Sequence, residues 1–316
     1  MKTSHKQLAY AAALCGIALL GAASALRAQT PGGSFEPGWT LWESVQGSSD
    51  SAGFITRANT TVGYEINRYL SVDAGLPVYF IHASSSTSGL TSANGIGNVF
   101  VDVRLTAAGP AVTFISNLRG TAPTGDKSEG LSTGHGTFDW SNHLERAFGR
   151  IVPYLDLGVA NTVSDTPYYV RPFSSFGLVG HFEGGLGLQV SKYLRVSSAA
   201  YDIAASGEQT LYSRFMQPGG GSGMPLGASP KMPAAGSGSG SGPGGGPQRV
   251  YETSAVTTGS SSLGNDHGFF AGVNVFPGRW FDVGAGYSRS IPYQEDSVYF
   301  GFGVNIAALW KSAGRP

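Results

Sequence analysis

One stretch of the sequence brings together side chains that could transfer protons or hold a metal ion. Asp139, Ser141, His143 and Glu145 occupy every second position, and Asp156 follows a short distance later. A serine, a histidine and an acid are the components of a hydrolytic triad, and a histidine with carboxylates can also ligate a metal. Each interpretation requires elements that place these side chains on one common face.

The spacing of two indicates β-strands, because successive side chains of a strand point to opposite faces. If residues 149–150 form a two-residue turn, the register sets His143 opposite Asp156 and Glu145 opposite Tyr154. Such a cluster could be a metal site, a proton-transfer pair, a patch that contacts a solute, or a set of mutually satisfied charges. The last interpretation is favoured, because one histidine among scattered carboxylates is weak evidence for a metal. We therefore expect no catalytic residue, no metal and no cofactor.

Period-two alternation continues along most of the chain and predicts an all-β protein. The predicted strands are 38–46, 54–66, 69–81, 96–107, 111–122, 136–148, 151–163, 176–190, 194–205, 266–276, 280–290 and 298–310. The connections near Asn67, Ala108, Gly149, Ser191 and Pro277 are short, whereas those at 47–53, 82–95, 123–135, 164–175, 206–265 and 291–297 are long. Short turns at one end and long loops at the other are typical of outer-membrane barrels. We predict an antiparallel transmembrane up-and-down β-barrel of about 12 strands, with a range of roughly 10 to 14.

The two faces of each predicted strand differ in chemistry. Within 96–107, valines and a leucine occupy one face, whereas Asp102 and Arg104 lie on the other. The apolar face would form the core of a soluble sandwich, but it would face lipid in a barrel whose polar face lines the lumen. Lipid contact is favoured by the aromatic residues beside the turns, namely Tyr69, Phe148, Tyr193, Trp280 and Phe281. The side chains expected to line the lumen are those of Arg57, Glu65, Asp73, Asp102, Arg104, Asn117, Arg119, Asp139, His143, Glu145, Asp156, His181, Glu183, Arg195 and Asp282.

Composition agrees with this architecture. Formal charge is balanced, with 20 Lys and Arg residues against 20 Asp and Glu residues, which argues against a nucleic-acid partner. Glycine accounts for 48 of 316 residues and charged residues for only 13%. Few charges and many glycines suit a chain whose apolar residues are spread over every second position. The expected partners are outer-membrane lipid, a small solute and the barrel-assembly machinery, and the oligomeric state stays open.

The first 28 residues have the order of a secretory signal peptide. Two lysines precede an apolar run, and small residues suited to cleavage follow at 23–25 or 26–28. The alternative is a membrane anchor, which needs roughly 20 apolar residues. Cys15 is the single cysteine and lies inside the run, so residues 29–316 would contain neither a disulfide nor a thiol site. The chain is therefore expected in the outer membrane of a Gram-negative bacterium.

Two further segments are distinctive. Residues 216–248 consist mostly of Gly, Pro and Ser, have almost nothing to bury, and are expected to be a disordered insertion in a long external loop at 206–265. The segment "GTAPTGDKS" at 120–128 resembles a nucleotide-binding glycine loop, but Asp126 separates the glycine from the lysine. No helix can begin directly after it, so nucleotide binding is not expected.

Residues 95–159 contain a series of motifs in a fixed order, "GIGNVFVDVRL", "TAPTGD", "GLSTGHGTFDW" and "GRIVPYLDLGV". In this series the chain resembles the outer-membrane barrel family named for the MetA pathway of phenol degradation, in which a glycine-rich strand opening, a "PTGD" loop, an "STG" loop and a hairpin recur. Asn98 departs from that pattern, which has an aspartate there, and "KSAGRP" follows Trp310 where many such barrels end on an aromatic residue. The resemblance implies a channel or transporter-like barrel over 38–310, for aromatic or other hydrophobic compounds. It assigns no binding residues.

These observations together predict an outer-membrane channel or transporter-like barrel that passes or binds small solutes without covalent chemistry. Two alternatives stay open. The first is a structural or surface-interaction barrel that acts through its external loops, and the second is a lipid-modifying barrel enzyme. Conductance in planar bilayers separates the channel from both alternatives, and a lipid hydrolysis assay tests the enzyme.

Overall fold

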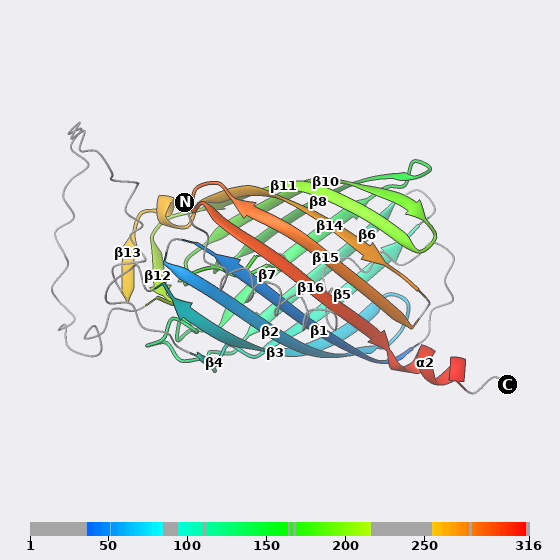
Figure 1. Ribbon diagram of the computed structural model, residues 1–316, viewed down its shortest axis with the longest axis horizontal. Coiled ribbons are helices and arrows are strands. Elements are labelled where there is room, and N and C mark those ends of the chain that lie inside the picture. Colours follow the sequence, from blue (N-terminus) through cyan, green and yellow to red (C-terminus); the bar gives the residue numbers. More distant parts are fainter. Residues whose placement is uncertain are drawn as a thin grey trace, which may run out of the picture.

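The computed structural model describes residues 37–50, 52–84, 94–109, 112–163, 165–166, 169–215, 255–277 and 280–313. Most of them form long antiparallel strands that wrap around a common axis (Figure 1). These strands are β1 (Gly38–Ser49), β2 (Gly53–Glu65), β3 (Leu70–Ala83), β5 (Phe100–Ala108), β6 (Thr113–Thr121), β7 (Thr137–Glu145), β8 (Ile151–Ala160), β10 (Val179–Ser191), β11 (Leu194–Ala205), β14 (Asp266–Val275), β15 (Phe281–Ser290) and β16 (Glu295–Asn305).

The sheet closes on itself. Each of these twelve strands pairs with its neighbours in the ring, and β1 pairs with both β2 and β16. Closure leaves no exposed strand edge along the wall, since every strand is paired with a neighbour on both sides. The predicted all-β fold, its up-and-down antiparallel order and its strand number are confirmed.

Some predicted boundaries are wrong. The last strand was expected at 298–310, but β16 ends at Asn305 and is followed by a helix, α2 (Ile306–Ala313). The alanine-rich sequence "IAALWKSA" favours helix over strand, which period-two counting cannot detect. The expected strand 96–107 is interrupted. A short strand, β4 (Asn94–Ile96), pairs with residues 78–80 of β3 and ends before β5 begins.

The two ends of the barrel differ. Short turns and α2 lie at one end, here called the turn end, while the long connections lie at the other, here called the loop end (Figure 1). At the loop end a second sheet contains β9 (Phe173–Phe176), β12 (Gln209–Ser213) and β13 (Val256–Gly259), and a short helix η3 (Ser261–Leu263) follows it. The proposed signal peptide at 1–28 and the insertion at 216–248 lie outside the described residues. No helix in the described ranges is long and apolar enough to cross a membrane.

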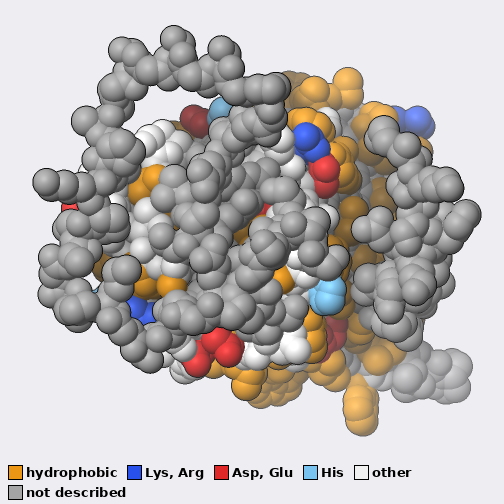
Figure 2. Space-filling model, turned by 60° about the vertical axis from the view of Figure 1, so that its left-hand side comes forward, with side chains coloured by type: hydrophobic (Ala, Val, Ile, Leu, Met, Phe, Trp, Pro, Cys, Tyr) orange, Lys and Arg blue, Asp and Glu red, His pale blue; other side chains and the backbone are white. Residues whose placement is uncertain are grey.

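The outer wall is apolar. Val101, Val103 and Leu105 of β5 are 46%, 38% and 53% exposed, whereas Asp102 between them is only 3% exposed. Figure 2 shows hydrophobic side chains gathered along the outside of the barrel, beside the loop end. The alternation therefore places apolar residues outside and polar residues inside, which reverses the arrangement of a soluble sandwich.

Glycines let large side chains fill the interior. A Cβ atom at Gly303 would lie only 2.3 Å from the ring of Trp42, which is its direct partner on β1. A Cβ at Gly185 would lie 2.4 Å from the ring of Tyr154 on β8. Glycine in a strand commonly marks such a close approach. The high glycine content therefore has a packing role, in which inward rings lie flat over the backbone of neighbouring strands.

Candidate functional site

The barrel encloses a cavity of about 310 Å³. Its lining reaches Glu145, the last residue of β7, toward the turn end. Toward the loop end it is lined by Asp165 and neighbouring residues of the connection after β8. Trp42, Ile115 and Phe270 contribute apolar surface, and most of the remaining lining is polar or charged. Pockets that bind small molecules commonly combine these two kinds of wall.

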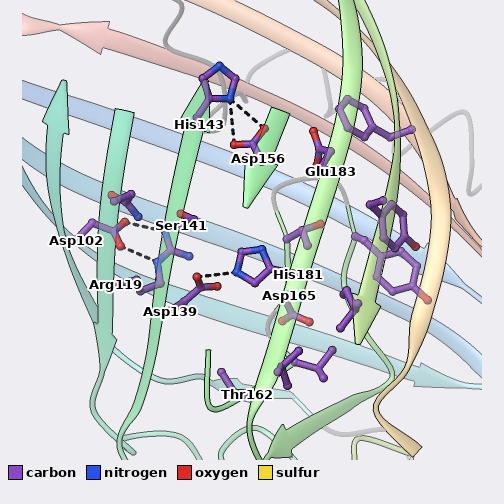
Figure 3. A pocket seen from close by; sticks show the side chains of 18 of the residues that line it. Asp102, Arg119, Asp139, Ser141, His143, Asp156, Thr162, Asp165, His181 and Glu183 are labelled. Carbon is purple, nitrogen blue, oxygen red and sulfur yellow. Dashed lines mark hydrogen bonds and ion pairs between the residues drawn. The ribbon is translucent and has the colours of Figure 1, made fainter. Parts of the chain in front are cut away.

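A first row of charged side chains runs along the inner wall from β3 to β6. Arg104 Nη2 lies 3.3 Å from Asp73 Oδ2. Arg119 donates from Nε and Nη2 to the two carboxylate oxygens of Asp102, each at 2.7 Å (Figure 3). This two-pronged geometry is the strongest form of an arginine–carboxylate pair. Each carboxylate of the row is buried and has an arginine beside it.

His181 extends this row across an intervening strand. Its Nε2 lies 3.0 Å from Asp139 Oδ1, although β8 runs between β10 and β7. The ring lies above Gly158 of β8, where a Cβ atom would approach it to within 2.1 Å. The absence of a side chain at Gly158 thus permits the contact between His181 and Asp139.

A second row lies on β7, β8, β10 and β11. His143 Nδ1 is 3.0 Å from both carboxylate oxygens of Asp156, and its Nε2 is 3.6 Å from Glu145 Oε2. Arg195 donates from Nη2 to Glu145 at 3.1 Å. Glu183 lies directly opposite Asp156 in the β8–β10 ladder, so two carboxylates lie side by side on the inner wall (Figure 3).

The connection after β8 enters the barrel. Residues 161–172, of which 164, 167 and 168 are not described, are called the inserted segment below. The backbone oxygen of Thr166 accepts hydrogen bonds from Gln46 Nε2 at 3.1 Å and from Arg57 Nη2 at 2.8 Å. Val170 N donates to Ser48 Oγ at 3.0 Å. Because β1 is six places from β8 in either direction around the ring of twelve, the segment crosses to the opposite wall.

A buried ion pair anchors the inserted segment. Arg171 Nη1 lies 2.5 Å from Asp266 Oδ2, and both side chains are 0% exposed. Asp266 also accepts hydrogen bonds from Ser290 Oγ at 2.6 Å and from the Tyr201 hydroxyl at 3.2 Å. Burial alone would lower the pKa of Arg171, but the charge of Asp266 outweighs it and raises that pKa above its usual value. Arg171 therefore stays charged inside the protein.

A second anchor is centred on Asp165. Its carboxylate lies 3.0 Å from Arg214 Nη1 and 3.3 Å from Arg57 Nη1, and it accepts a hydrogen bond from the Tyr79 hydroxyl at 2.6 Å. Burial alone would raise the pKa of Asp165, but the two guanidinium groups outweigh it and hold the pKa well below its usual range. The segment is therefore tied to β2, β3 and the chain after β12 by one ionised carboxylate.

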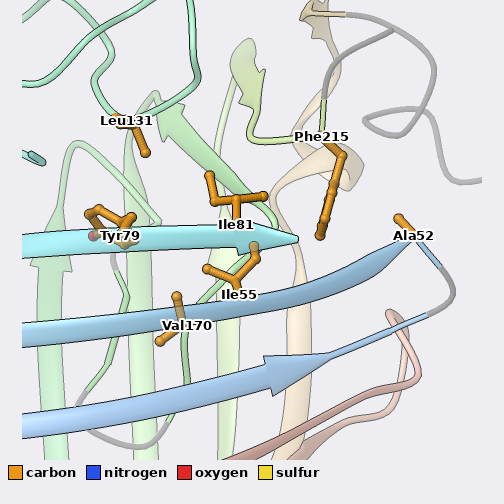
Figure 4. Packing of buried hydrophobic residues seen from close by; sticks show 7 residues of the cluster. All are labelled: Ala52, Ile55, Tyr79, Ile81, Leu131, Val170 and Phe215. Carbon is orange, nitrogen blue, oxygen red and sulfur yellow. The ribbon is translucent and has the colours of Figure 1, made fainter. Parts of the chain in front are cut away.

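Apolar residues complete the packing at the loop end. Val170 of the inserted segment belongs to a buried cluster drawn from β2, β3 and the loops (Figure 4). The cluster consists of Ala52, Ile55, Tyr79, Ile81, Leu131, Val170 and Phe215. Val163 belongs to a second cluster, with Phe173, Val179, Ile203, Leu211 and Tyr293. The inserted segment is thus fixed by hydrophobic burial as well as by charge.

The structure divides the fifteen predicted lumen residues into two groups. Eleven line the cavity, namely Asp73, Asp102, Arg104, Asn117, Arg119, Asp139, His143, Glu145, Asp156, His181 and Glu183. Four face inward elsewhere. Arg57 holds the inserted segment, Arg195 pairs with Glu145, Glu65 accepts a weak hydrogen bond from Asn305, and Asp282 lies beside Gly303. The predicted pairing of His143 with Asp156 and of Glu145 with Tyr154 is confirmed.

Sequence reasoning missed the residues of the inserted segment that line the cavity. Asp165, Tyr169 and Arg171 were expected in an external loop. One signal could have indicated otherwise, since "SDTPYYVRPF" contains three aromatic residues and a valine beside its two charges. Solvated loops rarely contain so many large apolar groups, so their presence favours a buried segment.

The motifs that carry the family resemblance lie together in space. Thr124 Oγ1 donates to the backbone oxygen of Gly97 at 3.0 Å and accepts from Val99 N at 2.9 Å. Gly125 N donates to Asn98 Oδ1 at 3.2 Å. An amide oxygen can accept this bond as a carboxylate oxygen would, so asparagine at 98 keeps the contact. The "PTGD" loop therefore fills the break between β4 and β5.

The contacts of Asp139, Ser141 and His143 bear on the hydrolytic and metal interpretations. His143 and His181 are engaged by Asp156 and Asp139, and among the described residues neither is hydrogen-bonded to Ser141. In the same part of the chain, no three His, Cys, Asp or Glu side chains come together as a metal site. Asp139 and His143 therefore belong to separate contacts, the first with His181 and the second with Asp156.

Comparison with known proteins bears on the fold. No protein family matches the sequence, and no curated protein matches it either. Among solved structures, an outer membrane channel from Pseudomonas putida F1 is similar, with a TM-score of 0.54, 9% sequence identity, and coverage of 86% of this chain and 96% of that chain. The NanC porin matches with a TM-score of 0.46, 7% identity, and coverage of 83% and 99%, which is too distant to add to the argument.

Proposed function

We propose that this protein is an outer-membrane channel for small solutes and performs no covalent chemistry. One observation carries the proposal, namely a cavity of about 310 Å³ inside a closed barrel whose outer wall is apolar. An apolar outer wall suits lipid, and a polar interior suits a water-filled path. The similar channel from Pseudomonas putida supports the fold on which the proposal depends.

The two kinds of cavity wall indicate the class of solute. Trp42 and Phe270 offer apolar contact, while Asp139, Asp156 and Glu183 offer hydrogen-bond acceptors. We infer an amphipathic solute with an aromatic or aliphatic body and a polar group. This class agrees with the resemblance to the phenol-degradation barrel family, and we propose that the chain is a member of that family.

The inserted segment determines how such a channel would work. Among its described residues, Asp165, Thr166, Tyr169 and Arg171 form part of the lining on the loop-end side of the cavity. A solute that crosses the barrel along this cavity would pass these residues. We therefore expect the closed form to conduct weakly and the segment to limit the rate of passage.

The remaining expectations belong to the same proposal. Residues 1–28 would be removed on export, the barrel-assembly machinery would insert the mature chain, and the turn end would face the periplasm. Folding of a closed barrel should produce a detergent-resistant species that migrates differently before and after boiling. Refolded protein that shows no such shift would contradict the membrane barrel.

Conductance and uptake test the channel directly. Refolded protein should give discrete current steps in planar bilayers and should admit phenol-sized solutes into liposomes. Ser141→Trp, which places a large ring in the cavity lining, should reduce both. Asn142→Trp, one position along and on the opposite face of β7, should leave both unchanged. Folded protein with neither current nor uptake would favour the surface-interaction barrel, and lipid hydrolysis would favour the enzyme.

A further inference from the structure

Three of the short turns share one arrangement at the turn end. In each, a cationic side chain lies over the ring of an aromatic residue one or two positions later. The pairs are Arg68 over Tyr69, Arg146 over Phe148 and Lys192 over Tyr193, with the charged group 4.4, 4.9 and 4.7 Å from the ring centre, respectively. Contacts of this kind hold a cation near the negative face of the ring.

The rings continue the apolar outer wall. Tyr69, Phe148 and Tyr193 are 49%, 56% and 48% exposed, and apolar residues such as Ile66 and Ile151 are exposed beside them. A long cationic side chain can lay its carbon stem on such a surface while its charge reaches water. Each pair therefore presents an apolar body toward the barrel wall and a positive charge at the wall's edge.

The three turns that hold these pairs carry only positive charge. The turns at 66–69, 146–150 and 191–193 contain four basic residues and no acidic residue. At the loop end, the described connections contain Asp50, Asp126, Glu129 and Glu208. The exposed cation Lys127 lies between Asp126 and Glu129 in the sequence. A partner that approaches the turn end thus meets cations without competing carboxylates in these three turns.

The three pairs are spread around the barrel. Their turns join β2 to β3, β7 to β8 and β10 to β11, which are separate places in the ring of twelve strands. A single small anion could contact only one of them. A flat anionic surface that surrounds the barrel could contact all of them together.

We propose that the cation–aromatic pairs of the turn end bind the phosphate headgroups of anionic phospholipids in the adjoining leaflet. The aromatic rings would lie at the boundary between acyl chains and headgroups, where aromatic belts are found. The cations would lie at the depth of the phosphates and favour an anionic headgroup over a zwitterionic one. The proposal rests on the proposed membrane location but is independent of solute passage.

Lipid selectivity in vesicles tests the proposal. The full chain is refolded into vesicles that contain brominated phosphatidylglycerol or brominated phosphatidylcholine, and quenching of tryptophan fluorescence gives their relative affinity. Trp39, Trp280 and Trp310 are exposed toward the turn end and should report it. We expect phosphatidylglycerol to be favoured by about fivefold, the effect of roughly one cation near an anionic surface. High salt should reduce the preference.

Substitutions identify the groups responsible. The combined variant Arg68→Gln, Arg146→Gln and Lys192→Gln should lose the preference, while Lys127→Gln at the loop end should keep it. The same gel shift as in the unchanged protein shows that the variants are folded. Equal quenching by the two lipids in the unchanged protein, or an unaltered preference in the combined variant, would overturn the proposal. Failure to enter either vesicle would instead refute the membrane location, and this proposal with it.

Discussion

The two ends of the barrel are built from different kinds of contact. At the turn end, each connection is fixed by neighbours in the sequence, as where Asn67 Oδ1 accepts hydrogen bonds from Tyr69 N and Leu70 N. At the loop end, the inserted segment depends on partners such as Gln46 and Asp266, which are about 100 residues away or more. The turn end can therefore form locally, whereas the loop end requires a completed barrel.

This difference has a functional meaning. The turn end offers short, exposed, chemically similar units that suit contact with a continuous surface. The loop end concentrates buried charge on one segment, and a buried charge is costly to leave unpaired. Loss of a single partner there should therefore release the segment, whereas substitution of a turn-end cation should leave the segment in place.

The largest effect is expected from removing the buried cation of the inserted segment. Arg171→Met leaves the carboxylate of Asp266 buried without its cation, which should destabilise the closed arrangement by about 3–5 kcal/mol. Single-channel current should rise, and added protease should cut the segment more readily. Arg171→Met combined with Asp266→Asn should recover part of the closed behaviour, and Arg68→Gln serves as the turn-end control. Unchanged current in folded Arg171→Met would show that the segment does not limit conduction.

The next effect compares the two faces of the wall. Ser116 faces outward and accepts a hydrogen bond from Trp140 Nε1 at 3.0 Å, whereas Asn117 lines the cavity. A lysine on the lipid face costs about 2–4 kcal/mol at the bilayer midplane, so Ser116→Lys should destabilise the refolded barrel. Asn117→Lys should be milder and should alter ion preference. Urea unfolding in lipid vesicles measures both, and a reversed order would contradict the assigned faces.

The wall could be predicted from the sequence because its rule is local. Within each strand, the period of two assigns Asp102, Asn117 and Glu183 to the polar face. The short turns then fix the register between neighbouring strands. The contact between His181 and Asp139 could not be predicted in this way. It depends on Gly158 of the strand between them, and register counting pairs only adjacent strands.

The inserted segment lay beyond the sequence rules for a similar reason. A loop between two predicted strands carries no periodicity, so nothing assigns Arg171 to the interior until its partners are known. Its partner Asp266 lies on β14, and Asp165 of the same segment is held from β2 and from the chain after β12. The change from strand to helix at Ile306 was missed because apolar alternation ends gradually there.

A moderate effect is expected where a glycine supports a contact across strands. Gly158→Ala places a Cβ 2.1 Å from the ring of His181, which must move away from Asp139. Overpacking of this kind costs about 1–3 kcal/mol. Gly184→Ala on β10 is the matched control, since a Cβ there meets nothing within 4 Å. Urea unfolding should separate the two variants, and equal stability would show that His181 has room to adjust.

The smallest effect is expected from lowering the pH, because the carboxylate of Asp165 stays ionised over the ordinary range. Because its pKa is depressed in the folded protein, the carboxylate stabilises the inserted segment above its unfolded pKa of about 3.9, and this stabilisation is lost as the pH falls further. Current should therefore be constant from about pH 8 to pH 5 and should rise only below about pH 4. Asp165→Asn should remove this acid dependence and should conduct more at neutral pH, because Arg57 and Arg214 lose their charged partner. A rise in current centred near pH 6 would instead assign the switch to a histidine, and the anchor at Asp165 would then not control opening.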